Sequence, residues 1–243
     1  MAAPKISEAH QVKDWLNAAV SVAVLTGAGI SAESGIPTFR GDGGLWNNFR
    51  AEDLATPEAF ARDPKLVWEW YDWRRGLIAA AEPNAGHRAL AQLERRSPRF
   101  TLITQNVDGL HDRAGSVSVL KLHGDIWTIR CTACERERHD ARPRMETLPP
   151  RCFCGGLERP GVVWFGEGLP GAVWDEAVSS AREADLFFVI GTSALVHPAA
   201  GLVHLAKSEG AKVVEINVAE TAVSSTVDLC WRAPAAEALP LLL

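Results

Sequence analysis

The sequence predicts an α/β fold, in which helices cover both faces of a parallel sheet and a smaller second domain is attached. Short apolar runs rich in β-formers predict buried strands at residues 20–26, 100–104, 117–122, 186–190 and 213–216. Helical patterns lie before and between these runs, at residues 8–19, 87–95, 174–182 and 198–208. Strands that alternate with helices in this way are typical of a parallel sheet covered on both sides.

Length and composition agree with one large or two small globular domains. The chain has 243 residues, 47% of them apolar and 23% charged, so it can bury a core and is not a disordered chain. A net charge of -5 argues against a dedicated nucleic-acid-binding protein. Residues 1–10 show no secretory signal, and the longest apolar run, 186–190, is too short to cross a bilayer. We therefore expect a cytoplasmic protein with no membrane or nucleic-acid partner.

Two stretches interrupt the alternation of strands and helices. Residues 41–85 contain no convincing strand and show helical patterns, including a helix that is expected to begin at Pro64 with Asp63 as its N-cap. Residues 124–159 carry four cysteines, many charges and three prolines. Both stretches follow sheet elements and return to sheet elements. We interpret them as insertions that together build the smaller domain.

The first predicted strand ends in a glycine turn, Gly27 to Ala32, with the pattern G-x-G-x-x-A. Such glycines let backbone N–H groups approach a pyrophosphate, although a purely steric turn is the alternative. The usual dehydrogenase layout needs a second strand within a unit of about 30 residues. Here the next strand begins near Phe100, and residues 34–41 are too rich in Gly and Pro for a long helix. The turn is therefore compatible with a dinucleotide, but not with standard hydride transfer.

Four cysteines lie within 24 residues, in a C-x2-C pair and a C-x-C pair. They are Cys131, Cys134, Cys152 and Cys154. Four clustered thiolates are the set that a structural Zn²⁺ takes in tetrahedral geometry, and they leave no open position for catalysis. The second pair is tighter than usual, so His139 is a possible substitute ligand. Four unrelated buried thiols are the alternative, and Cys230 stands alone.

Further motifs follow the glycine turn in a fixed order. They read GAGISAESGIPTFRG at 27–41, TQNVDGLH at 104–111, KLHGD at 121–125, VVWFGE at 162–167, GTSALVHPAA at 191–200 and EIN at 215–217. With the paired cysteines, this set resembles the signature of the sirtuins, the NAD-dependent protein lysine deacylases, over about residues 15 to 235.

The resemblance implies how the chain is divided into domains. A Rossmann-like NAD-binding domain would comprise residues 1–40, 86–123 and 160–243. The small domain would combine the helical insertion at 41–85 with the zinc module at 124–159. NAD and an acylated lysine would meet between the two domains.

The resemblance also implies an NAD site. The glycine loop would hold the pyrophosphate, Asn106 and Asp108 would face the nicotinamide, and the later motifs would bind phosphate and adenosine. Asn106 and Asp108 could instead be ordinary turn formers before Gly109. The implied cofactor-binding residues are Gly27, Ala28, Gly29, Ala32, Thr38, Phe39, Arg40, Trp46, Gln105, Asn106, Asp108, Gly191, Thr192, Ser193, Asn217 and Ala235. At Ala235 the chain reads Ala-Pro-Ala where relatives often have Gly-Pro before a small residue.

His123 and Asn106 match the catalytic positions of the family. A histidine can accept a proton at neutral pH, although a lone histidine is more often a satisfied polar group. The resemblance implies that NAD is consumed rather than reduced. Nicotinamide would be expelled, His123 would take a ribose hydroxyl proton, and the acyl group would leave the lysine as O-acyl-ADP-ribose.

The segment from 162 to 167 matches the part of sirtuins that pairs with the substrate backbone as an added strand. The implied substrate-binding residues there are Val162, Val163, Trp164, Phe165, Gly166 and Glu167. The partner would be an acylated-lysine protein or peptide in an extended conformation. An ordinary strand is the alternative.

Tyr71 and Arg74 lie at spacing i, i+3 on one face of a predicted helix. They match the Tyr-x-x-Arg of the desuccinylase and demalonylase branch, and Ala55 matches that branch's small residue, which widens the acyl pocket. The alternative is a surface Tyr-Arg pair in a plain deacetylase.

Two other functions stay open at this point. One is mono-ADP-ribosyl transfer to protein through the same NAD site, and the other is a non-enzymatic NAD or ADP-ribose sensor. The presence of Asn106, Asp108 and His123 counts against the sensor. The sequence offers no account of Gly161 or Cys230.

Overall fold

The computed structural model describes residues 6–38 and 51–243. The strands of its larger sheet are β1 (Ser21–Thr26), β2 (Arg99–Thr104), β3 (Val119–Lys121), β7 (Leu186–Ile190), β8 (Lys212–Ile216) and β9 (Leu229–Trp231). They pair in parallel in the order β3-β2-β1-β7-β8-β9. A separate antiparallel sheet has the order β5-β4-β6 and consists of β4 (Gly124–Cys131), β5 (Glu137–His139) and β6 (Glu158–Val162).

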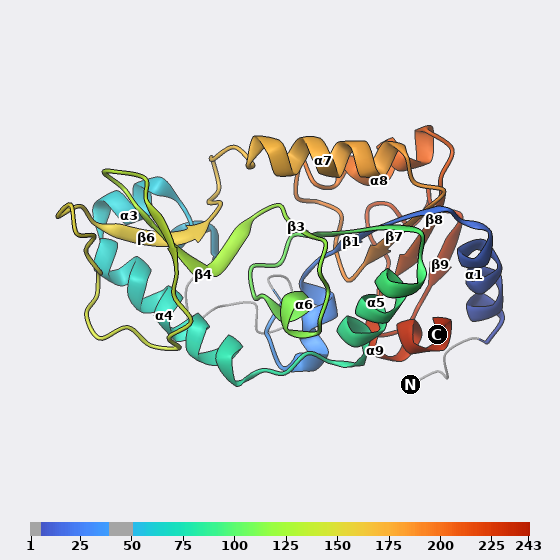
Figure 1. Ribbon diagram of the computed structural model, residues 1–243, viewed down its shortest axis with the longest axis horizontal. Helices are drawn as coiled ribbons and strands as arrows, with labels where there is room; N and C mark the ends of the chain where they lie inside the picture. Colours follow the sequence, from blue (N-terminus) through green and yellow to red (C-terminus); the bar gives the residue numbers. More distant parts are fainter. Residues whose placement is uncertain (1–5, 39–50) are drawn as a thin grey trace.

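Helices cover the larger sheet on both sides and build much of the smaller part (Figure 1). Those beside the larger sheet are α1 (Ile6–Ala18), η1 (Ala28–Ser34), α5 (Ala85–Arg96), α6 (Leu110–Arg113), α7 (Gly171–Arg182), α8 (Gly201–Ser208), α9 (Ala235–Ala238) and η2 (Leu239–Leu242). The smaller part contains α2 (Ala51–Leu54), α3 (Pro57–Arg62) and α4 (Pro64–Ala80). Within residues 6–38 and 51–243, no helix is long and apolar enough to cross a membrane.

Side-chain alternation along the strands assigns each residue to one of two cores. Along β1, Val22 and Val24 face a cluster with α1 and α5, while Ala23 and Leu25 face a cluster with α7 and α8. All six residues of β1 are buried, which explains why the run is apolar at every position but its ends. The predicted parallel sheet with helices on both faces is confirmed.

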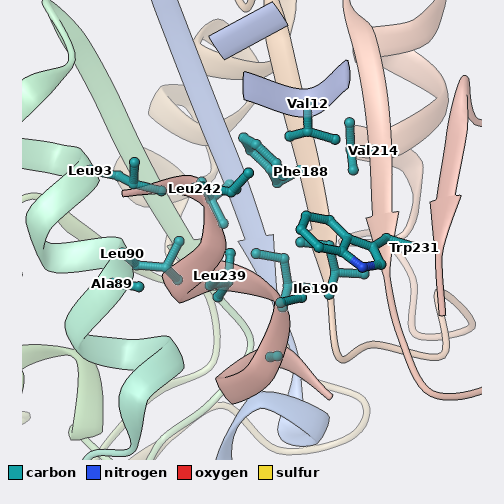
Figure 2. Packing of buried hydrophobic residues seen from close by; sticks show 14 of the residues in the cluster. Val12, Ala89, Leu90, Leu93, Phe188, Ile190, Val214, Trp231, Leu239 and Leu242 are labelled. Carbon is teal, nitrogen blue, oxygen red and sulfur yellow. The ribbon is translucent and has the colours of Figure 1, made fainter. Parts of the chain in front are cut away.

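The C-terminus completes one of these cores. Leu239 and Leu242 of η2 pack beside Leu90 of α5, and Trp231 of β9 lies on the same side (Figure 2). Trp231 is 1% exposed, so the last strand buries the largest side chain of this cluster. A short element at the chain end therefore contributes to the central core.

A third core lies in the smaller part, between α4 and the antiparallel sheet. Trp68 of α4 is fully buried there and donates its indole N–H to the carbonyl oxygen of Glu158, at 2.7 Å. Arg75 of α4 is also fully buried and pairs with Asp140, whose Oδ1 lies 3.1 Å from its Nη2. The helical segment and the cysteine-bearing segment thus form one small domain, although its exact boundaries stay a prediction.

Some elements differ from the sequence-based expectations. β9, α9, η2 and the three strands of the smaller sheet were not predicted, because they are short or interrupted by charges. The predicted strand at 117–122 is limited to β3, and Val117 is 90% exposed. The extended segment expected at 162–167 is strand only at Val162, because Glu167 donates its N–H to the Trp164 carbonyl and closes a turn.

Candidate active site

The glycine turn lies against the end of β7. Gly27 donates its N–H to the Ile190 carbonyl at 3.0 Å, and Gly29 donates to Gly191 at 2.7 Å. A Cβ on Gly27 would lie 2.7 Å from that of Thr192, and one on Gly29 would lie 2.7 Å from the Cα of Gly191. Real side chains cannot approach so closely, so these positions require glycine. The turn continues into the 3₁₀ helix η1, which keeps the loop short.

The carboxyl ends of the parallel strands bring further predicted residues together. Gln105, after β2, donates its Nε2–H to Thr192 Oγ1 at 3.0 Å. Asn217, after β8, donates its Nδ2–H to the Thr192 carbonyl at 2.9 Å. Thr192 is buried and Ser193 beside it is half-buried. Open α/β sheets bind ligands at this edge, where the strand order reverses direction.

Ala235 reaches the same region from the other end of the chain. It opens α9, and its carbonyl oxygen would lie 3.2 Å from a Cβ placed on Gly86 at the start of α5. The next residue, Ala236, donates its N–H to Glu33 of η1 at 3.0 Å. Ala235 is therefore adjacent to the glycine loop, although it is itself 5% exposed.

Asn106 and Asp108 are buried beneath the glycine loop and share a partner, Ser31. Ser31 donates its hydroxyl to Asp108 Oδ2 at 2.8 Å and accepts from Asn106 Nδ2 at 3.3 Å. Asn106 also donates to the Gly27 carbonyl at 3.1 Å. Burial raises the pKa of Asp108, while bonds from Leu110 and Ser31 oppose that shift. Sequence reasoning missed Ser31, which lies at the second position after Gly-Ala-Gly.

A pair of buried histidines lies behind Ser31. His87 and His111 have ring centroids 4.9 Å apart. Asn84 donates its N–H to His87 Nδ1, so the proton of His87 is on Nε2, which lies 3.4 Å from Ser31 Oγ. His111 Nε2 lies 3.0 Å from Thr26 Oγ1. Burial lowers the pKa of His87 to about 4 and that of His111 well below its usual value, so both rings are neutral.

His123 follows β3 and is half-buried. Its Nδ1 lies 3.0 Å from the Gln105 carbonyl oxygen. A carbonyl only accepts, so Nδ1 carries the proton and Nε2 is left as a lone-pair acceptor. Burial lowers the pKa of His123, which keeps the ring neutral near pH 7. The residue is therefore in the form that a general base requires.

The three residues predicted to recognise the acyl group are all buried in the smaller part. Ala55 and Arg74 are 8% and 5% exposed, and Tyr71 is 2% exposed. The Arg74 guanidinium lies 5.8 Å from the centre of the Tyr71 ring. Burial lowers the pKa of Arg74 to about 10, and Tyr71 and Asp108 are among the groups close enough to oppose that shift. This pair is thus not the surface pair that was the alternative.

The segment after β6 is held by a partly buried ion pair. Arg159 donates two bonds to the carboxylate of Glu167, at 2.5 and 2.9 Å, and its guanidinium stacks 3.4 Å from the centre of the Trp164 ring. Phe165 donates its N–H to the Ala55 carbonyl at 2.9 Å and keeps its side chain 45% exposed. Glu167 therefore shapes this segment through Arg159, a role that its place in the motif did not reveal.

The four clustered cysteines converge as predicted. Their sulfur atoms all lie within 4.8 Å of one another, with Cys131 to Cys154 at 3.5 Å and Cys134 to Cys152 at 3.8 Å. A tetrahedral zinc with bonds of about 2.3 Å needs sulfurs about 3.8 Å apart. The four cysteines are placed to bind one structural zinc ion. His139, the possible substitute, is exposed on β5 and is not part of this cluster.

The structure also explains Gly161. A Cβ there would lie 2.6 Å from both Cβ and Cγ2 of Thr128, on the neighbouring strand β4, where the pairing register shifts. Cys230 has a local role, since its thiol lies 3.2 Å from the Ser224 carbonyl.

The remaining predicted cofactor residues belong to the glycine loop and the segment that follows it in the sequence. Ala28 and Thr38 are half-buried and Ala32 is exposed. Phe39, Arg40 and Trp46 lie outside the described residues.

Comparison with known proteins gives consistent matches over most of the chain. The family model described as the Sir2 family matches residues 27–198. A protein of Aquifex aeolicus (strain VF5) named NAD-dependent protein deacylase is 56% identical over 221 residues, covering 90% of this chain and 92% of its own. An NAD-dependent protein deacylase 2 of Pyrobaculum aerophilum is 53% identical and covers 95% and 93%.

Solved structures agree with the sequence matches. A structure described as a Sir2 homolog-NAD complex superposes with a TM-score of 0.92 at 46% identity, covering 96% of this chain and 92% of the other. Another, described as Sir2-p53 peptide-NAD+, gives a TM-score of 0.86 at 33% identity and covers 95% of each chain.

Proposed function

The chain belongs to the Sir2 family, which uses NAD as co-substrate, and from this premise we propose that it is an NAD-dependent protein lysine deacylase that removes succinyl and malonyl groups as well as acetyl. One observation carries the proposal. A neutral His123 bonds through Nδ1 to the carbonyl of Gln105, which directly precedes Asn106, and Asn106 and Asp108 in turn share Ser31 beneath the glycine loop.

The residues around the glycine turn fit NAD. Gly27, Gly29 and Gly191 bring the loop and the end of β7 closer than side chains would allow, which leaves backbone groups near the place for a pyrophosphate. We assign Thr192, Ser193 and Asn217 to the phosphates and the adenosine ribose. NAD supplies the ADP-ribosyl group that accepts the acyl chain, with nicotinamide as the leaving group.

Asn106 and Asp108 are assigned to the nicotinamide end. Their side chains are fixed by Ser31, so they present an amide and a carboxyl group without needing to reorganise. Both groups can complement the donors and acceptors of a carboxamide.

His123 is assigned as the general base. Its Nδ1–H is directed to the Gln105 carbonyl, so Nε2 can accept a proton from a ribose hydroxyl without a change of tautomer. The same carbonyl holds the ring in place. The buried histidines His87 and His111 are too weakly basic for this role at neutral pH.

The acyl preference follows from charge. A succinyl or malonyl carboxylate loses its water on burial, and an unpaired buried charge is costly, so a cation must meet it. Arg74 and Tyr71 place a guanidinium and a hydroxyl in the same buried region, with the small Ala55 in the same core. We assign these three residues to the acyl chain.

The protein substrate is assigned to the segment after β6. Within the described residues β6 pairs only with β4, so it is an edge strand of its sheet, the kind of strand to which an extended peptide can be added. Val162 and Val163 are the residues best placed for such pairing, because the chain turns at Trp164 to Glu167.

Incubation of the protein with NAD and a set of acyl-lysine peptides tests the proposal. Nicotinamide release with loss of the acyl mass from the peptide is the expected result, and mass spectrometry ranks succinyl, malonyl and acetyl. Nicotinamide release with labelling of protein would indicate ADP-ribosyl transfer instead. Neither product would indicate a sensor.

A further inference from the structure

Trp164 and Tyr71 share a hydrogen bond that restricts the tyrosine. The indole Nε1–H of Trp164 donates to the Tyr71 hydroxyl oxygen at 2.9 Å, and both side chains are buried. The hydroxyl therefore acts as an acceptor on that side. Among residues 6–38 and 51–243, no acceptor receives the hydrogen of this hydroxyl.

A buried donor without an acceptor is unfavourable, and a ligand acceptor would relieve that cost. Burial raises the pKa of Tyr71 to about 12, so the phenol keeps its proton at neutral pH. The hydrogen cannot turn toward Trp164, because the indole already donates there. Its remaining directions lead away from Trp164.

We propose that Trp164 is a positioning residue for acyl-chain specificity, because its indole N–H fixes the Tyr71 hydroxyl as a donor toward the ligand. This inference deepens the proposed function and rests on it. An acyl chain that ends in a carboxylate offers an acceptor to this donor, whereas an acetyl methyl group offers none.

Trp164 is itself held on three sides. The Arg159 guanidinium stacks on its ring, and Glu167 accepts its backbone N–H at 2.8 Å while binding Arg159. On another side the Phe60 ring lies 5.3 Å away. The indole thus keeps its orientation without help from a substrate. The series of contacts from Arg159 through Trp164 to Tyr71 is already formed before a substrate binds.

The first experiment measures kcat/KM for succinyl- and acetyl-lysine peptides in Trp164→Phe, Tyr71→Phe and the double variant. Loss of one such bond should lower the succinyl-to-acetyl ratio roughly three- to tenfold in Trp164→Phe, mainly through KM. The double variant should lose no more than Tyr71→Phe alone, because both changes act on one hydroxyl. An unchanged ratio in Trp164→Phe, or fully additive losses, would overturn the inference.

Trp68→Phe is the matched control. It also removes a buried indole bond in the same core, but that indole donates to the Glu158 carbonyl and not to the Tyr71 hydroxyl. Its ratio should stay at the wild-type value. A fall equal to that of Trp164→Phe would mean that loosening the core, not the direction of the indole, sets the ratio.

The second experiment needs no turnover and uses the fact that Tyr71 is the single tyrosine of the chain. Tyrosine labelled with ¹³C at Cζ gives one NMR resonance, which reports on the hydrogen bonds of the hydroxyl. A succinyl-lysine peptide should shift it in the wild-type protein, and an acetyl-lysine peptide should not. Equal shifts with both peptides, or none with either, would overturn the inference.

The two experiments separate this inference from the proposed function. If no acyl peptide yields nicotinamide, the proposed function fails, whatever the NMR resonance shows. If the enzyme deacylates but Trp164→Phe leaves the succinyl-to-acetyl ratio unchanged, only the inference fails.

Discussion

The buried histidines should make the protein lose stability in mild acid. His87 and His111 are fully or almost fully buried and neutral, with pKa values lowered by burial, the first to about 4. In the unfolded chain each would titrate near 6.5. Below that pH the unfolded state binds more protons than the native state, so stability must fall as pH falls.

The size of this loss of stability follows from how far burial lowers each histidine pKa. Each histidine contributes a slope of roughly 1.4 kcal/mol per pH unit between its two pKa values. For His87 this sums to about 3 kcal/mol by pH 4, and His111, whose pKa is also lowered by burial, adds a slope of the same sign. That is a large part of the roughly 5–15 kcal/mol of a typical domain.

Urea unfolding at pH values from 7.5 to 4.5 measures the slope. Replacing His87 by Gln removes one buried titrating group. The unfolding free energy of this variant should therefore change with pH less steeply than that of the wild type, by about 1.4 kcal/mol per pH unit. Zinc release in acid changes the unfolding free energy of both proteins equally, so it cancels in the difference between their slopes. His204→Gln, at an exposed position of α8, should keep the wild-type slope. Equal slopes for the wild type and His87→Gln would refute the reasoning.

Four further outcomes are expected. Cys131→Ala should abolish stoichiometric zinc by metal analysis and lower stability and solubility, and full activity of metal-free protein would contradict this. His123→Ala should keep the fold but lower deacylation about 10²–10⁴-fold, while nicotinamide exchange survives. In the wild-type enzyme, the fall of kcat/KM on the acid side should lie below pH 6.5. The reason is that burial lowers the pKa of His123, so the base stays neutral as the pH falls to that value. Arg74→Met should cut desuccinylation roughly ten- to a hundredfold, mostly through KM, and a wild-type preference for acetyl-lysine would count against this. Gly161→Ala should cost about 1–3 kcal/mol in denaturant unfolding by contact with Thr128, and Thr128→Ala should restore part of that loss.

The sequence predicted the parts of the fold that depend on local pattern. The run Leu186–Ile190 is strand from end to end, because a buried central strand is apolar at every position. Asp63 does cap α4 by accepting the N–H of Leu66, as its place before Pro64 indicated. The strand β9 carries Cys230 between Leu229 and Trp231 and is too short for a pattern to identify.

In the candidate site, too, the features that depend on local residue type were predicted, and those that depend on tertiary contacts were not. The glycine and cysteine positions were predictable because close backbone approach and metal ligation demand those residue types, whereas the catalytic role of His123 stays a prediction. The contact of Ser31 with Asp108 joins residues 77 apart in the chain, and that of Arg159 with Trp164 depends on how the turn folds back. Such contacts depend on tertiary packing, which a single sequence does not display.

The sheet order has a consequence for how the protein is synthesised. β1 is the fourth strand from one edge and pairs with β2 on one side and β7 on the other, and the bond from Ser21 to Asp185 spans 164 residues. A growing chain therefore holds a strand with an apolar centre and one unpaired edge until most of the polypeptide has left the ribosome. Open apolar edges promote wrong pairing between chains. The nascent chain therefore stays prone to aggregation until its C-terminal third has been released and β7 can pair with β1.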